Sequence, residues 1–183
     1  IQEHSLRWVS TPIVQVQANP QHVELLALWN CIFQHDNRLD DSGQLSFLVL
    51  GAAVIAAWAR RVGVSRPLAA AVGATWIALP PVFLQAHSAH VDVAWSAMFT
   101  AAVYFTVGRP ERRDRWMGFV AWGLFLGTKY TGPFHLALFA PYLVARALVE
   151  VFAHPRRDRW RALGDVALSA CVAPLLGLPK YVQ

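Results

Sequence analysis

The sequence predicts an all-α protein, a bundle of about six membrane-spanning helices that follows an outward-facing N-terminal segment. Three observations lead to this prediction. Of the 183 residues, 56% are hydrophobic and only 15% are charged, whereas a soluble domain carries about a quarter charged residues. Long stretches without charge alternate with short clusters of arginine. These stretches approach the ~20 apolar residues that a helix needs to cross a bilayer.

Apolar stretches that are candidates for spanning helices lie at 43–60, 67–86, 91–108, 115–130, 131–150 and 162–179. Some are shorter than the ideal length, which burial inside a bundle or snorkelling flanking residues accommodates. We expect Pro80 and Pro81 to kink or break the second stretch near its outer end, because proline cannot continue a helical hydrogen-bond ladder. A soluble bundle is the alternative, but each of its helices would need a charged face that these stretches lack.

The arginine clusters predict how the spans are oriented. They fall between the first and second, the third and fourth, and the fifth and sixth stretches: Arg60, Arg61 and Arg66; Arg109, Arg112, Arg113 and Arg115; Arg156, Arg157, Arg159 and Arg161. Since two spans separate each cluster from the next, all the clusters fall on one side, which the positive-inside rule identifies as cytoplasmic. The sequence therefore predicts a multi-pass protein of the cell membrane whose turns at 85–92 and 128–132 face outward.

Residues 1–42 differ from the bundle at 43–183, and we expect them to form an outward loop with interfacial helices. Leu6, Trp8 and Val9 are apolar anchors for a first interfacial helix. A second, largely apolar helix is expected from Pro20 to about Phe33, because proline suits a helical first turn. The chain begins at Ile1 without Met, and we expect it to be a piece of a longer protein.

The formal net charge of +5 does not indicate a nucleic-acid partner. The arginines sit in short clusters between apolar runs, whereas a nucleic-acid-binding domain gathers its basic residues on one face. Two widely separated cysteines make no disulfide framework. The glycine-rich motifs that cradle nucleotide phosphates are also missing from the sequence, so no nucleotide site is expected.

Asp92 and Lys129 are the main candidates for chemistry on the outward side. Asp92 opens an apolar stretch, where a carboxylate either stabilises a helix N-terminus or is poised to bind a cation or take a proton. Lys129 ends another stretch, where its ammonium either snorkels to the interface or neutralises a phosphate. Tyr130, beside it, fits either interpretation because tyrosine is common at membrane interfaces.

A divalent metal ion is a candidate cofactor. His87, His90 and Asp92 form an H-x-x-H-x-D pattern, and imidazole and carboxylate together can hold zinc or another divalent ion. The spacing is not a specific signature, and solvated loop histidines are the alternative. Glu24, in its otherwise apolar segment, is either paired, exposed on a polar edge, or part of a substrate-binding site.

Taken in order, several motifs resemble one family. They are the segment 20–29, a span that ends in Ala59-Arg60-Arg61-Val-Gly63, Pro80-Pro81 with Gln85-Ala-His-Ser-Ala-His-Val-Asp92, and Gly123-x-x-x-Gly127-Thr128-Lys129-Tyr130-Thr131-Gly132. Together they resemble the polytopic glycosyltransferases of the C superfamily. The nearest in pattern are bacterial enzymes similar to dolichyl-phosphate-mannose protein mannosyltransferases and to the aminoarabinose transferase of lipid A. The resemblance extends from about Trp8 to Tyr181.

The resemblance implies transfer of a sugar from a polyprenyl-phosphate carrier to an acceptor lipid, glycan or protein on the outer face of the membrane. Asp92 then matches the second outward acid of these enzymes, and Lys129 matches the basic residue near the carrier phosphate, with Tyr130 and Glu24 as further substrate-binding candidates. The acid that the family carries in its first outward loop would lie upstream of Ile1. A polytopic transporter or a non-catalytic membrane scaffold is the alternative, although the sequence has no inverted repeat.

Overall fold

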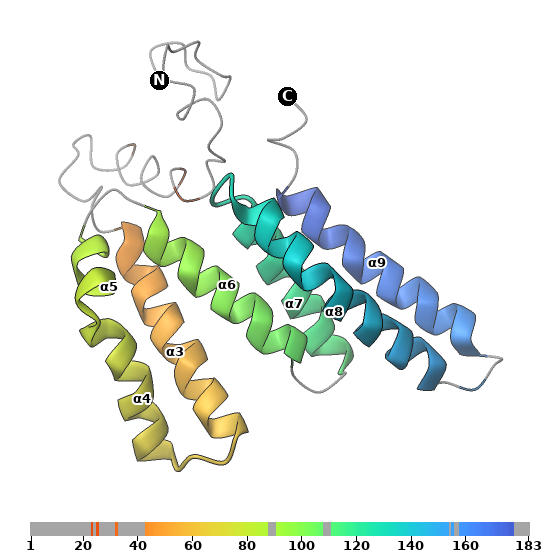
Figure 1. Ribbon diagram of the computed structural model, residues 1–183, viewed down its shortest axis with the longest axis horizontal. Coiled ribbons are helices and arrows are strands. Elements are labelled where there is room, and N and C mark those ends of the chain that lie inside the picture. Colours follow the sequence, from red (N-terminus) through yellow and green to blue (C-terminus); the bar gives the residue numbers. More distant parts are fainter. Residues whose placement is uncertain are drawn as a thin grey trace, which may run out of the picture.

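The computed structural model describes residues 23, 25, 32, 43–87, 91–107, 111–153, 155 and 158–177. In these residues the protein is all-helical, as the sequence predicts. The helices are α3 (Leu45–Arg61), α4 (Arg66–Ala78), α5 (Pro80–Gln85), α6 (Asp92–Val107), α7 (Arg112–Leu126), α8 (Gly132–Ala153) and α9 (Arg159–Gly177). Figure 1 shows α3, α4 and α6 beside one another at one side of the molecule, and α7, α8 and α9 at the other. The predictions for the rest of residues 1–42, including Glu24, lie outside the described residues.

The stretch predicted at 67–86 is divided into two helices. Leu79 is extended, with φ −65° and ψ 121°, and Pro80 begins the six-residue α5 directly after it. A residue that precedes proline is pushed out of the helical region because the proline ring crowds its backbone. The break at Leu79 confirms the effect predicted for Pro80 and Pro81.

Small residues allow neighbouring helices to approach closely. A Cβ atom added at Gly73 of α4 would lie 2.5 Å from the backbone oxygen of Ala52 in α3. One added at Gly123 of α7 would lie 2.8 Å from the Leu176 Cβ of α9, and one at Gly177 would lie 2.5 Å from the Leu126 Cβ. Such contacts leave no room for a side chain, and they are typical of helices that pack backbone against backbone in membranes.

Aromatic side chains fill the space between α6, α7 and α8. Trp122 and Phe125 of α7 are completely buried, and both rings contact Phe99 of α6, with centroids 5.9 Å and 5.3 Å away. The Trp122 indole N–H donates a 3.0 Å hydrogen bond to the Thr106 hydroxyl. This bond satisfies a polar group that would otherwise be costly to bury.

One of the described helices, α8, is both long and apolar enough to cross a membrane. Its 22 residues extend over about 33 Å, and only 6% of its most apolar window is buried. A core helix of a soluble protein would be covered, whereas α8 exposes Phe134, Leu138, Val144, Val149 and Phe152. The other stretches predicted to span form helices that are shorter or less apolar, so length and composition favour one span among the described helices instead of six.

The close approach of α7 to α9 makes a testable prediction. Gly123→Ala places a methyl group against the Leu176 Cβ and the backbone of Ala173, 3.1–3.2 Å away. The helices must separate, and we expect a loss of about 1–3 kcal/mol in the free energy of unfolding. The measurement is the thermal unfolding of the purified protein in detergent.

Gly164→Ala in α9 is the matched control, because a Cβ there meets no heavy atom within 4 Å. This variant should be as stable as the wild type or more stable by up to about 1 kcal/mol. Equal stability of the two alanine variants would contradict the close packing of α7 on α9.

Candidate functional site

Asp92 and Lys129 meet at one end of the bundle. Asp92 is the first residue of α6, and Lys129 lies in the turn that follows α7. The Lys129 Nζ atom is 2.5 Å from the Asp92 Oδ1 atom. The Lys129 side chain is 30% exposed and the Asp92 side chain is 34% exposed, so both groups remain accessible to a ligand. The sequence placed these two residues on the same side of the protein, and the structure brings them into direct contact.

The first turn of α6 holds Asp92 in place. Gln44, which is buried just before α3, accepts a 2.9 Å hydrogen bond from the Ala94 backbone N–H. The Ser96 hydroxyl donates to the Asp92 backbone oxygen at 2.8 Å. Gln44 therefore satisfies an N–H group that the start of the helix leaves without a partner, while the Asp92 carboxylate is turned to Lys129. The helix dipole adds a favourable interaction with the carboxylate at this position.

The turn after α7 positions Lys129. Thr128 is buried, and its hydroxyl donates to the Leu124 backbone oxygen at 2.7 Å. The Lys129 backbone oxygen accepts a 2.9 Å hydrogen bond from the Gly132 N–H, which closes the turn before α8. The Lys129 ammonium also lies 5.8 Å from the centre of the Trp95 ring. Because the flanking residues are tied to α7 and α8, the ammonium is held over one turn of α6.

His135 is a site residue that the sequence analysis did not select. It lies in the first turns of α8, with its ring edge-on to Trp95 at a centroid distance of 4.8 Å. Its Nδ1 atom is 3.0 Å from the Thr131 backbone oxygen, so Nε2 is the ring nitrogen left to meet a ligand. The Trp95 indole nitrogen is buried and has no hydrogen-bond partner among the described residues. The sequence signal was a single histidine in an apolar stretch, directly after the Lys129 motif.

The remaining predicted site residues lie outside the ion pair of Asp92 with Lys129. Tyr130 follows Lys129 and is 47% exposed. His87 lies after α5, where its Nδ1 atom is 2.8 Å from the Phe83 backbone oxygen and its ring packs on Phe83. His90 and Glu24 lie outside the described residues. Within those that are described, no group of three or more histidine, cysteine or acidic side chains could hold a metal ion, and metal binding by the predicted trio stays a prediction.

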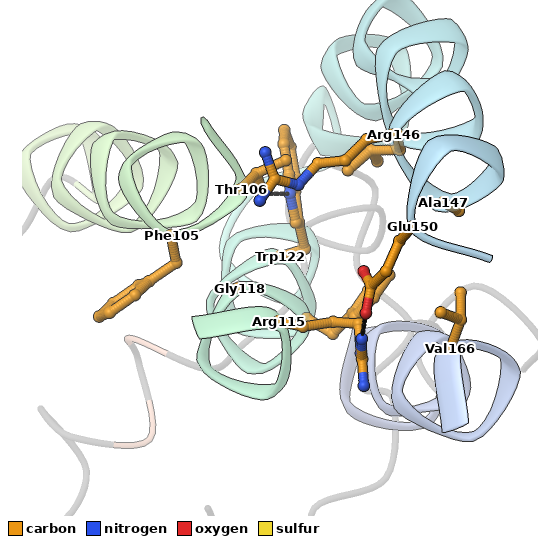
Figure 2. A pocket seen from close by; sticks show the side chains of 11 residues that line it. Phe105, Thr106, Arg115, Gly118, Trp122, Arg146, Ala147, Glu150 and Val166 are labelled. Carbon is orange, nitrogen blue, oxygen red and sulfur yellow. Dashed lines mark hydrogen bonds and ion pairs between the residues drawn. The ribbon is translucent and has the colours of Figure 1, made fainter. Parts of the chain in front are cut away.

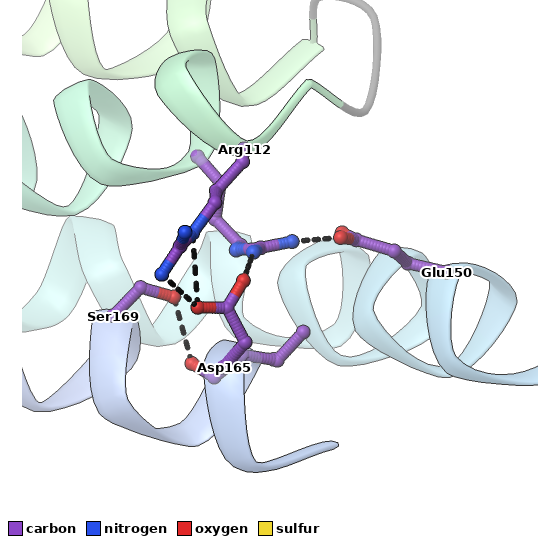
Figure 3. A network of polar contacts seen from close by, with 6 residues as sticks. Arg112, Glu150, Asp165 and Ser169 are labelled. Carbon is purple, nitrogen blue, oxygen red and sulfur yellow. Dashed lines mark hydrogen bonds and ion pairs between the residues drawn. The ribbon is translucent and has the colours of Figure 1, made fainter. Parts of the chain in front are cut away.

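A second polar cluster lies at the opposite end of the bundle, where the arginine-bearing helix ends meet. Arg115 of α7 pairs with Glu150 of α8 and with Asp165 of α9, and Arg112 reaches Asp165 at 3.0 Å (Figure 3). Arg61, at the end of α3, lies 3.4 Å from Asp114. The sequence assigned Arg112 and Arg115 to a linker, which is wrong because both lie in the first turn of α7. Acids on α8 and α9 neutralise the charge of the largely buried Arg115.

No family model matches the chain, and neither a curated protein nor a solved structure matches it.

The contact between Asp92 and Lys129 can be tested by a double-mutant cycle with Asp92→Asn and Lys129→Met. An exposed ion pair contributes about 0.2–1 kcal/mol, and partial burial places this one near the upper end of that range. We expect a coupling energy of about 1 kcal/mol, measured as unfolding free energies in detergent. Arg113→Gln, at the far end of the bundle, is the control partner for Asp92→Asn, and this pair should be additive within about 0.5 kcal/mol. Additivity of Asp92→Asn with Lys129→Met would contradict the contact.

Proposed function

We propose that this chain forms part of a multi-pass membrane glycosyltransferase, which moves a sugar from a polyprenyl-phosphate carrier to an acceptor on the outer face of the membrane. The observation that supports this most is the paired Asp92 and Lys129 at the end of the bundle away from the arginines. A carboxylate and an ammonium side by side are the two groups that this transfer needs. The carboxylate can receive a proton, and the ammonium can stabilise a phosphate.

A membrane location is supported by where the apolar and the charged side chains lie. α8 exposes large apolar side chains along its length, and a contiguous apolar surface of this kind marks a membrane or protein contact. Arg112 and Arg115 share the Asp165 carboxylate at one end of the bundle, where Arg61 also pairs with Asp114. An end rich in arginine is expected on the cytoplasmic side, which leaves Asp92 and Lys129 on the outer side. Helices shorter than a full span are accommodated by local thinning of the bilayer or by packing against their neighbours.

The ion pair gives the proposed site a mechanism in which donor binding activates the acid. Without a donor, Asp92 and Lys129 neutralise one another. The phosphate of the carrier competes with Asp92 for the Lys129 ammonium, and this releases the carboxylate to accept a hydrogen bond from the acceptor hydroxyl. The hydroxyl oxygen then attacks the anomeric carbon, its proton passes to the carboxylate, and the bond between that carbon and the phosphate oxygen breaks. The departing carrier phosphate keeps the electron pair and is stabilised by Lys129.

The proposed orientation can be tested by labelling single cysteines in intact cells. Ser65→Cys and Arg113→Cys lie at the arginine end, His87→Cys lies at the other end, and all three positions are exposed. In a protein whose Cys31 and Cys171 are replaced by serine, a membrane-impermeant maleimide should label only His87→Cys from outside. The other two should react only after the membrane is opened. Labelling of Arg113→Cys in intact cells would contradict the orientation, and with it the site.

The proposed chemistry predicts different behaviour for Lys129 and Asp92 variants of the protein that contains this chain. Lys129→Met keeps the apolar stem and removes the charge, so polyprenyl-phosphate binding to the protein in lipid should weaken by about 2–5 kcal/mol, roughly 30- to several-thousand-fold. Partial exposure of Lys129 places the expected value at the low end of that range. Lys129→Arg should restore part of the binding, because it keeps the charge with a different geometry.

Asp92→Asn is the companion variant in the same experiment. It should bind the polyprenyl-phosphate as tightly as the wild type or more tightly, because the competing carboxylate is gone. Its sugar transfer should nevertheless fall by about 10²–10⁴-fold. Equal carrier binding by wild type and Lys129→Met would leave Lys129 as an interface anchor, and normal transfer by Asp92→Asn would leave Asp92 as a helix-end residue.

A further inference from the structure

Trp95 of α6 carries a hydrogen-bond donor that the protein leaves unused. Its indole nitrogen, Nε1, is buried and has no hydrogen-bond partner among the described residues. Trp122 of α7 shows the satisfied arrangement: its indole N–H donates to the Thr106 hydroxyl on the wall of a pocket at the arginine end of the bundle (Figure 2). A buried N–H group without an acceptor is costly, so an oxygen atom that binds beside Trp95 gains a hydrogen bond there.

His135 of α8 supplies an acceptor next to this donor. Its ring meets the Trp95 ring edge-on, with the two centroids 4.8 Å apart. Its Nδ1 atom lies 3.0 Å from the Thr131 backbone oxygen. Because a carbonyl oxygen can only accept, Nδ1 carries the hydrogen of the neutral ring, and Nε2 is left with a lone pair. A ligand beside the two rings therefore meets an N–H donor from Trp95 and an acceptor from His135.

A hydroxyl group is complementary to this donor and this acceptor. Its oxygen can accept a hydrogen bond from the Trp95 N–H, while its hydrogen is donated to the His135 Nε2 atom. An ionised carboxylate or phosphate oxygen has no hydrogen to give and can fill the first role alone. The aromatic rings also offer apolar surface to C–H groups. A sugar ring combines the two features, since it carries hydroxyl groups at its edge and C–H groups on its faces.

The two side chains are close to the surface of the bundle. Trp95 and His135 are both half-buried, although the Trp95 Nε1 atom itself is covered. A hydroxyl group that reaches Nε1 has to displace part of this cover. α8 has little buried surface to lose, because only 6% of its most apolar window is buried. We therefore expect the ligand to enter from the α8 side.

We propose that Trp95 and His135 bind a hydroxyl group of the sugar that the carrier delivers. The Lys129 ammonium lies 5.8 Å from the centre of the same Trp95 ring, and Lys129 is the residue proposed to bind the carrier phosphate. The sugar is bonded directly to that phosphate, so it is the part of the donor that reaches Trp95 and His135. The inference rests on the proposed function, and it adds the residues that distinguish a loaded carrier from an empty one.

The experiment compares the binding of loaded and empty carriers to the protein that contains this chain, in nanodiscs of phosphatidylcholine. The probes are decaprenyl phosphate and the same lipid carrying mannose, glucose, galactose or arabinose. Wild type should bind at least one loaded carrier more tightly than the empty one. His135→Phe keeps an aromatic ring without its nitrogens, and Trp95→Phe removes the indole N–H. Each should weaken binding of that loaded carrier by about 2- to 10-fold, the effect of one hydrogen bond, and leave the empty carrier unchanged.

Two further variants separate recognition from packing. His135→Gln should recover part of the preference for the loaded carrier, because its side-chain oxygen is again an acceptor. Trp76→Phe is the matched control. The Trp76 indole nitrogen is also buried without a partner among the described residues, but it lies where a Cβ atom on Gly51 of α3 would be. Trp76→Phe should keep the wild-type preference.

An unchanged preference in His135→Phe and Trp95→Phe would overturn the proposal and assign the Trp95 N–H to bound water. Equal binding of loaded and empty carriers by wild type would also overturn it, as would an equal loss in Trp76→Phe or a loss that affects both carriers alike. If one of the two phenylalanine variants fails to fold, the other carries the test. Failure of the proposed function is seen separately, as equal binding of the empty carrier by wild type and Lys129→Met.

Discussion

Arg115 is the residue on which one half of the bundle depends. Its guanidinium is almost buried, and two carboxylates from two other helices, Glu150 of α8 and Asp165 of α9, hold it there. A charge taken out of water is stable only when its partners are well placed, and removal of one partner typically costs about 3–5 kcal/mol. The three helices therefore have to meet at this end in one register. The glycines of α7 and α9 then allow the backbones to close on one another further along.

The two ends of the bundle use charge differently. At the arginine end, Arg115 and Glu150 are largely shielded from solvent and Arg115 also pairs with Asp165, which suits a fixed structural contact. At the other end the pair of Asp92 with Lys129 keeps about a third of its exposure. Such a pair contributes little to stability, so a ligand can replace one of its members at small cost. The Asp92 end is therefore the end at which a charged ligand could bind with little loss of stability.

The sequence predicted the helical class, the break before Pro80 and the common end of Asp92 and Lys129, because each follows from local chemistry or from the alternation of helices along the chain. It did not predict the pairing of Arg115 with Glu150 and Asp165, since those contacts join residues 35 and 50 positions apart and depend on how the helices pack. The sequence analysis placed Arg112 in a linker for the same reason, because its contact with Asp165 depends on how α7 packs against α9. His135 was missed because its role comes from a Trp95 neighbour 40 positions away. The family and the activity remain proposals that rest on motif resemblance, and the contact of Asp92 with Lys129 gives experiments a geometry to test.

The crossing of α7 and α9 has a consequence for how the sequence can change over time. Gly123 and Gly177 lie against each other. A Cβ atom added at Gly177 would lie 2.8 Å from the Gly123 backbone oxygen, and it would also overlap the Leu126 side chain. A larger residue at either position would move the helices apart, and the other glycine would then no longer be required. The two positions are therefore coupled in their evolutionary history. In homologous chains we expect both positions to hold small residues, or both to hold larger ones together with a wider spacing between the two helices.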